Sequence, residues 1–236
     1  MNEGISVNAL SEVESQLRAL LVQLEGNTPG IEDVRTALSQ SETRAKLAEH
    51  LELVFQWNTK VDLISPAPVS VAVSRHVIDS VACALLVGQA FQGSLRSFVD
   101  IGSGAGFPGI VFSILYSELP GVLVEPREKR AVFLKEVKRR LKLERVYVSH
   151  SRVEDATIDQ LSSPSLYLVR ALSGDELTPE LLHPILVKNP GPICRMVSAQ
   201  WDSNSPAPWP KPERVIDYQL PLDGTKRRLA IWECFT

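Results

Sequence analysis

The sequence predicts an α/β protein built on a mostly parallel sheet with helices on both faces. From about residue 95 onward, short β-branched runs alternate with helical patterns, which is typical of βαβ units. The last two runs, DYQLPL and RRLAIWECF, flank a turn with Asp223 and Gly224, so the sheet is expected to end in an antiparallel pair. Residues 1–92 show only helical patterns, which predicts an N-terminal helical extension before a Rossmann-like domain over residues 93–236.

The extension is expected to hold three amphipathic helices. Residues 11–24 space their leucines on one helical face, and a second, longer helix covers 35–58. Pro66 and Pro68 exclude a helix through the next loop, and a third helix covers 71–88.

Five β-branched runs predict the parallel strands of the second domain. They are SFVDIG (97–102), GVLVEP (121–126), VYVSHS (146–151), LYLVRAL (166–172) and ICRMVSA (193–199). Helices are expected between them from about Pro108, over 128–143 and over 179–187.

Composition and charge indicate an ordinary globular protein with 44% hydrophobic and 22% charged residues. The net charge of −3 gives no global attraction to nucleic acid, so any basic surface must be local. Cys83, Cys194 and Cys234 lack CxxC spacing, which argues against a disulfide framework or a zinc site and fits a reducing cytoplasm. With no secretory signal and no uninterrupted apolar run of roughly 18 residues, we expect a cytoplasmic protein with no membrane contact and no metal.

A glycine-rich loop follows the first predicted strand. It contains Gly102, Gly104, Gly106 and Gly109, with Asp100 just before them. Glycine at the carboxyl end of a first strand permits positive φ and lets a ligand approach the backbone. A dinucleotide GxGxxG pattern would need glycine where Phe107 stands, which disfavours a nicotinamide dehydrogenase. The D-x-G-x-G-x-G pattern is instead similar to the first-strand loop of Rossmann-like class I S-adenosylmethionine methyltransferases; a tight turn without a ligand is the alternative.

An acidic residue ends the second predicted strand. Glu125 lies 23 residues after Gly102, and an acid about 20 residues beyond such glycines is placed to bind ribose hydroxyls. The alternative is a solvated charge at a strand end.

Six ordered motifs resemble one methyltransferase family. They are WNTKVDLIS (57–65), SRHVIDS (74–80), FVDIGSGAGFPGI (98–110), EKRAVFLKEV (128–137), SRVED (151–155) and VRALS (169–173). In this order and spacing, from about residue 45 to the C-terminus, the chain resembles the RsmG family, also called GidB. That family uses S-adenosyl-L-methionine to methylate guanine N7 in bacterial small-subunit rRNA. The resemblance implies 16S rRNA or the 30S subunit as the partner. Because guanine N7 carries a lone pair and no proton, we expect no general base and assign no catalytic residue.

The resemblance also implies a set of cofactor-binding residues. With the strand-tip acid, the candidates are Asp100, Gly102, Gly104, Gly106, Phe107, Glu125, Val153, Glu154 and Arg170. Among them, Val153 and Glu154 match the pair that holds the adenine in the family. For Arg170 the alternative is a surface ion pair with Asp175 or Glu176.

The segment 74–80 allows two interpretations. Arg75 and Asp79 lie four residues apart, as do His76 and Ser80, so each pair can share a helix face. One interpretation is an ion pair within the helix beside a capping or core histidine, which the residues alone favour. The other places Arg75 and His76 at the mouth of the active site, facing RNA, and the resemblance favours this for Arg75.

A local basic stretch covers residues 127–145, where nine basic and three acidic residues give +6. On the expected helix, the buried side should hold Val132, Phe133, Val137 and Leu141. The outward side should then present Lys135, Lys138, Arg139 and Lys142 to phosphates, with a solvated helix face as the alternative. Lys129 and Arg130 match a basic pair of the family. The candidate RNA-binding residues are Arg75, Lys129, Arg130, Lys138 and Arg139.

The chain departs from the family pattern in ways that mark a divergent member. Glu125 replaces the usual aspartate, and Asp62 stands where the family has asparagine. Val197 stands where a fifth-strand lysine is usual, and the proline-rich stretch 201–213 leaves little room for a helix before the sixth strand. The alternative function is therefore a noncatalytic relative that binds S-adenosylmethionine or RNA. We expect a monomer; the modified guanine and the role of residues 1–40 stay open.

Overall fold

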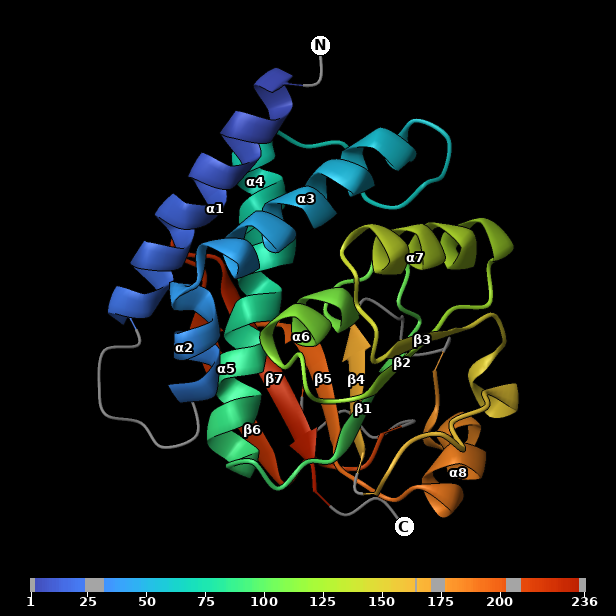
Figure 1. Cartoon of the computed structure of the whole chain (residues 1–236). Helices are drawn as coiled ribbons and strands as arrows, with labels where there is room; N and C mark the ends of the chain where they lie inside the picture. Colours follow the sequence, from blue (N-terminus) through green and yellow to red (C-terminus); the bar gives the residue numbers. More distant parts are fainter. Residues whose placement is uncertain (1–2, 24–31, 164, 171–176, 203–208, 234–236) are drawn as a thin grey trace.

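The computed structural model describes residues 3–23, 32–163, 165–170, 177–202 and 209–233. Its centre is a seven-stranded sheet with the order β3-β2-β1-β4-β5-β7-β6 (Figure 1). The strands are β1 Ser97–Ile101, β2 Gly121–Val124, β3 Val146–Ser149, β4 Ser165–Arg170, β5 Ile193–Ser198, β6 Arg214–Gln219 and β7 Lys226–Trp232. The first five strands pair in parallel, whereas β7 is antiparallel to both β5 and β6, as the sequence predicts.

The helices also follow the predicted order, with local differences at Gln40 and over residues 73–78. They are α1 Glu3–Gln23, α2 Glu32–Ser39, α3 Ser41–Asn58, α4 Val69–Ala72, the π-helical turn η1 Val73–Ile78, α5 Asp79–Phe91, α6 Gly109–Leu115, α7 Glu128–Arg140, the 3-10 turn η2 Val153–Asp155 and α8 Pro179–Lys188. The predicted helix over 35–58 is divided at Gln40, whose backbone is extended. Between β5 and β6, the described residues 199–202 and 209–213 contain no helix.

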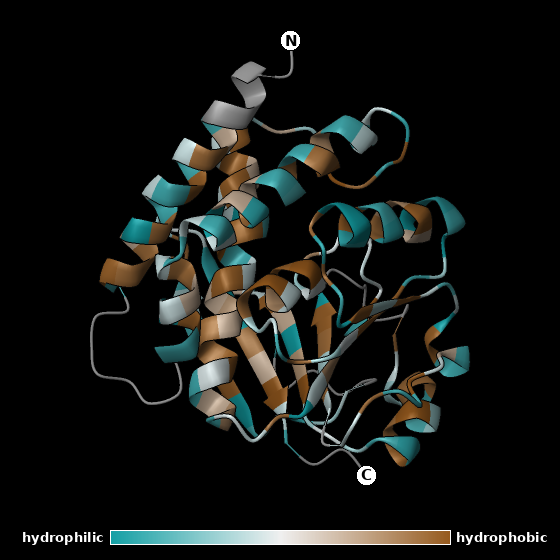
Figure 2. Cartoon of the chain, viewed as in Figure 1, coloured by the Kyte–Doolittle hydropathy of each residue, from teal (hydrophilic) through white to brown (hydrophobic). Residues whose placement is uncertain are grey.

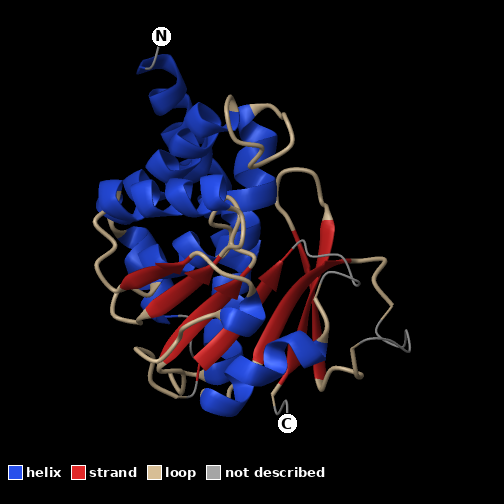
Figure 3. Cartoon of the chain, turned by 90° about the vertical axis from the view of Figure 1, so that its right-hand side faces the viewer, coloured by secondary structure: helices blue, strands red, loops and turns tan. Residues whose placement is uncertain are grey.

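The sheet is covered differently on its two faces (Figure 3). Strand residues alternate between the faces, so Phe98 joins the core formed with α5, α6, α7 and the N-terminal helices, while Val99 and Ile101 join the core formed with α8 and η2. Figure 2 shows the hydrophobic strands enclosed by helices whose outer sides are hydrophilic. Buried side chains of α1, α2 and α3 therefore share one hydrophobic cluster with a face of the sheet.

The continuous helix over Val69–Phe91 is long and apolar enough to cross a membrane by length and composition alone. However, 78% of its most apolar window is buried, and it packs against α1 and α6. Its hydrophobic composition is thus explained by its position in the core. The expectation of no such segment was based on uninterrupted apolar runs, which Arg75 and Asp79 break.

Candidate functional site

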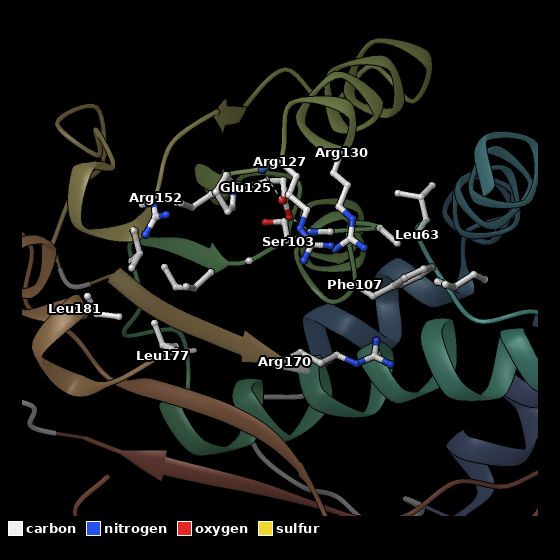
Figure 4. A pocket seen from close by; sticks show the side chains of 18 of the residues that line it. Leu63, Ser103, Phe107, Glu125, Arg127, Arg130, Arg152, Arg170, Leu177 and Leu181 are labelled. Atoms are coloured by element: carbon white, nitrogen blue, oxygen red, sulfur yellow. Dashed lines mark hydrogen bonds between the residues drawn. The ribbon is translucent and has the colours of Figure 1, made fainter. Parts of the chain in front are cut away.

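A cavity of about 890 Å³ opens at the carboxyl ends of the central strands (Figure 4). This is the edge where open α/β sheets bind ligands, and the volume lies in the range of ligand pockets. Seven of the nine predicted cofactor residues line it, namely Gly102, Gly104, Phe107, Glu125, Val153, Glu154 and Arg170. Leu63 and Ile64 come from the loop after α3 and complete one wall, which the sequence did not predict.

Asp100 does not line this cavity, contrary to the prediction. Its side chain leaves β1 on the same face as Phe98, because residues of like parity share a face. Asp100 is 1% exposed, and its Oδ2 accepts a hydrogen bond from the backbone N–H of Gly109 at 3.2 Å. Burial raises the pKa of Asp100 to about 7. Asp100 thus supports the start of α6 beneath the glycine loop.

Gly106 is also absent from the cavity lining, and its role is in packing. Its φ is +85°, and a Cβ built there would lie 2.5 Å from Ile110 Cγ1 and 3.0 Å from His50 Nε2. Only glycine fits this position without displacing its neighbours.

Glu125 connects the tip of β2 to the glycine loop. Its Oε2 accepts from the backbone N–H of Gly104 at 2.8 Å, and its Oε1 accepts from the N–H of Arg127 at 2.9 Å. With only 3% of its surface exposed, Glu125 is not a solvated charge at a strand end. Figure 4 places its carboxylate beside Ser103 in the middle of the cavity. Each oxygen keeps a lone pair for a ligand hydroxyl.

Phe107 packs against two imidazole rings. Its centroid is 4.4 Å from that of His50 and 5.2 Å from that of His76, which is stacked on it at 26°. His50 is fully buried, and its Nε2 donates to the carbonyl of Ala105 at 2.8 Å. Burial lowers the pKa of His50 to about 4, so the ring is neutral. No sequence pattern pointed to His50; only its spatial position reveals that it holds the loop.

Arg170 is fixed by contacts with the helix that contains η1. Its Nη2 donates to the carbonyl of Arg75 at 2.6 Å and to Nδ1 of His76 at 3.2 Å, and lies 3.7 Å from Oδ2 of Asp79. The Arg170 side chain is 15% exposed, and its partners among the described residues belong to this helix. The acids of the alternative surface ion pair, Asp175 and Glu176, lie outside the described residues.

Asp79 has partners other than the one expected within its helix. The hydroxyl of Tyr218 donates to its Oδ1 at 2.7 Å, and Nε of Arg227 lies 3.7 Å from its Oδ2. These contacts and the one with Arg170 replace the predicted Arg75–Asp79 ion pair among the described residues. The widened π-helical turn η1 turns the Arg75 carbonyl to Arg170, and such turns are frequent at functional sites.

Asn58 shapes the loop that closes the cavity near Leu63. Its Oδ1 accepts from the N–H groups of Leu63 and Ile64, and its Nδ2 donates to the Ile64 carbonyl at 2.9 Å. The guanidinium of Arg130 binds the backbone carbonyl of Asp62 through Nε at 3.1 Å and Nη2 at 2.5 Å. Arg130 binds the backbone carbonyl of residue 62, which aspartate and asparagine both have. The departure from the family's asparagine therefore leaves this contact unchanged.

The predicted RNA-binding side chains occupy different environments. Lys129 is exposed and lines a cleft of about 310 Å³. Arg130 lines both this cleft and the cavity. Lys138 Nζ lies 5.4 Å from the centre of the Tyr147 ring, and Arg139 forms a 2.8 Å ion pair with Glu136. Arg75 is exposed next to the cavity residue His76.

Two further sequence expectations can be compared with the structure. Val132, expected on the buried side of α7, is 47% exposed, and Leu134 is buried instead. At about 100° per residue, Val132 lies on the side of the helix opposite the stripe formed by Phe133, Leu134, Val137 and Leu141. Val197 pairs with Arg228 of β7 and does not line the cavity.

Among the described residues, no group of three His, Cys, Asp or Glu side chains could hold a metal ion.

Comparison with known proteins relates the site to one family. The family model described as GidB, rRNA small subunit methyltransferase G, matches residues 43–203. Ribosomal RNA small subunit methyltransferase G of Desulfotalea psychrophila is 29% identical over 185 residues, which cover 75% of this chain and 82% of that protein. The Colwellia psychrerythraea protein of the same name is 38% identical over 109 residues, or 46% of this chain and 49% of that protein.

Most of these alignments are shorter than the relatives themselves. The match with the Pseudomonas aeruginosa protein, 36% identical over 125 residues, covers 53% of this chain and 56% of that protein. The chain thus spans about half the length of several curated relatives it matches. Among solved structures, a human methyltransferase 10 domain containing protein is similar in fold, with a TM-score of 0.50, 14% identity and coverage of 80% of this chain and 98% of that chain.

Proposed function

Because the chain belongs to the rRNA small subunit methyltransferase G family, we propose that it transfers a methyl group from S-adenosyl-L-methionine to N7 of a guanine in 16S rRNA. The observation that supports this most strongly is the hydrogen bond between the glycine loop and Glu125 in the cavity. That cavity is built largely within the matched residues 43–203.

The residues present fit the cofactor. We propose that the Gly102–Gly104 backbone receives its methionine part, and that Glu125 accepts hydrogen bonds from the ribose hydroxyls. Val153 and Glu154 would hold the adenine, since a backbone N–H and a carboxylate match its ring nitrogen and its amino group. The cavity continues past Glu125 to Phe107 and Leu63, and we propose that the acceptor base enters at that end.

The chemistry requires orientation more than proton transfer. The bound cofactor supplies an electrophilic methyl group, and guanine N7 supplies a lone pair without a proton. The chain must therefore hold the base in line and exclude water, with reacting atoms roughly 3–3.5 Å apart. One wall of the cavity is suited to holding the base, because stacking and hydrogen bonds fix its side chains Phe107, His76 and Arg170.

RNA binding is proposed for the basic side chains around the cavity mouth. Arg130 lines both the cavity and the neighbouring cleft, Lys129 lines the cleft, and both would contact phosphates next to the target base. Arg75 and Lys138 extend this surface, while Arg139 contributes less because Glu136 already pairs with it.

We also propose that the protein acts as a monomer in the cytoplasm. Size-exclusion chromatography with light scattering would test the oligomeric state.

The experiment that tests this function uses 30S subunits that lack N7-methylated guanine. The protein is incubated with them and with tritiated S-adenosylmethionine, and the digested RNA is separated into nucleosides. We expect label in 7-methylguanosine and none in RNA from 50S subunits. Binding of S-adenosylmethionine without label would instead identify a noncatalytic relative. A rise in melting temperature with NAD and not with S-adenosylmethionine would identify a different cofactor.

A further inference from the structure

His76 is held in one orientation on the wall of the cavity. Its ring stacks on Phe107 with centroids 5.2 Å apart, and its Nδ1 lies 3.2 Å from Nη2 of Arg170. A guanidinium can only donate hydrogen bonds, so Nδ1 must accept. A neutral ring in this arrangement carries its proton on Nε2, and the side chain lines the cavity.

The surroundings of His76 keep its ring neutral. Burial lowers the pKa of His76 to about 3, and the nearby positive charges of Arg170, Arg75 and Arg227, together with His50, act in the same direction. A neutral ring offers one N–H donor and cannot supply a proton that would block the lone pair of guanine N7. His76 therefore fits a role in binding the acceptor without competing with methyl transfer.

Arg170 cannot easily release His76. The same Nη2 also donates to the Arg75 carbonyl, and the guanidinium lies 3.7 Å from the buried Asp79. Asp79 in turn accepts from the hydroxyl of Tyr218. Arg170 acts as a positioning residue, since it sets which nitrogen of His76 is protonated.

The position of this wall assigns it to the acceptor end of the cavity. Figure 4 shows Arg152, Leu177 and Leu181 toward one end, Glu125 in the middle, and Phe107, Arg170 and Leu63 toward the other. If adenine and ribose occupy the Val153–Glu125 side, as proposed above, the methyl acceptor enters beside Phe107 and Arg170. His76 contacts both of these side chains.

We propose that Nε2–H of His76 donates a hydrogen bond to O6 of the target guanine and so selects guanine over adenine. Beside N7, guanine presents the acceptor O6, whereas adenine presents an amino donor that would oppose the N–H of His76. This inference rests on the proposed methyltransferase function and adds the group that reads the base.

The test removes each partner of this hydrogen bond separately. After the target position is mapped with the unaltered protein, 30S subunits are assembled with guanine, 2-aminopurine or inosine at that position. The base 2-aminopurine lacks O6, whereas inosine keeps it and serves as the control. The matched variants are His76→Phe, which keeps a flat ring against Phe107, and His76→Gln, which keeps an N–H donor near the position of Nε2.

We expect 2-aminopurine to lower kcat/KM about 10- to 100-fold in the unaltered protein, because a buried donor is left without its acceptor. In His76→Phe the same base change should cost less than about threefold, while His76→Gln should keep most of the discrimination against 2-aminopurine. The altered reactivity of the base is common to all three proteins and cancels in this comparison. Inosine should be methylated like guanine by each.

Two measurements that do not depend on activity complete the test. Calorimetry should give the same affinity for S-adenosylhomocysteine in the unaltered protein and both variants, and nitrogen NMR should show His76 protonated on Nε2 only. An equal 2-aminopurine penalty in the unaltered protein and His76→Phe, or a proton on Nδ1, would overturn the assignment of His76 alone. Absence of methylation of any small-subunit RNA by the unaltered protein would overturn the proposed function and this inference together.

Discussion

Oε2 of Glu125 accepts a hydrogen bond from the backbone N–H of Gly104 at 2.8 Å, which joins two residues 21 positions apart in the sequence. The other oxygen accepts from the N–H of Arg127. One buried carboxylate therefore shapes the glycine loop and presents acceptors to the cavity. Its two roles suggest that loop geometry and cofactor affinity depend on the same side chain.

Replacing Glu125 with glutamine should weaken cofactor binding strongly. The amide offers one oxygen to two backbone N–H donors and removes the negative charge, so we expect about a 10- to 100-fold loss of affinity for S-adenosylhomocysteine in calorimetry. Glu125→Asp is the matched control, because it keeps the charge and loses only reach. An affinity of Glu125→Gln equal to that of the unaltered protein would show that this carboxylate does not bind the cofactor.

Gly104→Val should abolish cofactor binding by placing a side chain in the cavity-lining loop. Gly104 has a φ of +52°, and a Cβ there meets only ordinary contacts, with Arg130 Nη1 at 3.8 Å. Gly93→Val is the control, because Gly93 has a φ of +76° and open space around it. Both variants should lose about 1–2 kcal/mol of stability from backbone strain. If both bind S-adenosylhomocysteine equally well, the loop is not the binding site.

Lys129→Glu should reduce RNA affinity more than Arg139→Glu does. Lys129 is exposed beside the cleft, whereas Arg139 is already paired with Glu136. In a plot of log K for 16S rRNA against log salt, Lys129→Glu should make the slope less steep by roughly 0.7–0.9 for each phosphate that Lys129 neutralises. Affinity for S-adenosylhomocysteine should not change in either variant. Equal effects on RNA binding would contradict the assignment of the contact surface.

His50 should make the protein less stable at acidic pH. Its pKa in the folded protein is lowered from 6.5 to about 4, so between these values the unfolded chain binds a proton that the folded protein does not. The stabilising contribution is complete above pH 6.5 and is lost as the pH falls toward 4. Asp100 acts oppositely, because its pKa is raised to about 7 and its contribution is lost as the pH rises.

The variant His50→Gln isolates this effect, since its amide can still donate to the Ala105 carbonyl. Denaturant unfolding at several pH values should show the unaltered protein losing about 1.4 kcal/mol per pH unit more than the variant within this window. Parallel stability curves for the two proteins would mean that His50 does not remain neutral when folded.

Much of the fold follows from local signals in the sequence. Alternating strand and helix patterns, the glycine loop and the Asp223–Gly224 turn each act over a few residues, and all appear in the structure where predicted. The extended Gln40 and the π-helical turn over 73–78 were missed because tertiary contacts, more than local propensity, decide them.

Site residues could be placed from the sequence only where a local motif fixes their position relative to a strand or loop. Glu125 and Gly104 could be placed because a strand tip and a loop fix them. The contacts of Arg170 with His76 and of Asp79 with Tyr218 join residues 94 and 139 positions apart, so no sequence spacing reveals them. Asp100 was misplaced because a motif gives residue types but not the face of the strand on which a side chain lies.

The most direct test of the central claim is a crystal structure with S-adenosylhomocysteine bound. The expected density places adenine beside Val153 and Glu154, ribose hydroxyls on Glu125, and sulfur at the end of the cavity that holds Phe107 and Arg170. A cavity that stays empty at saturating ligand, or density located elsewhere on the protein, would contradict the account.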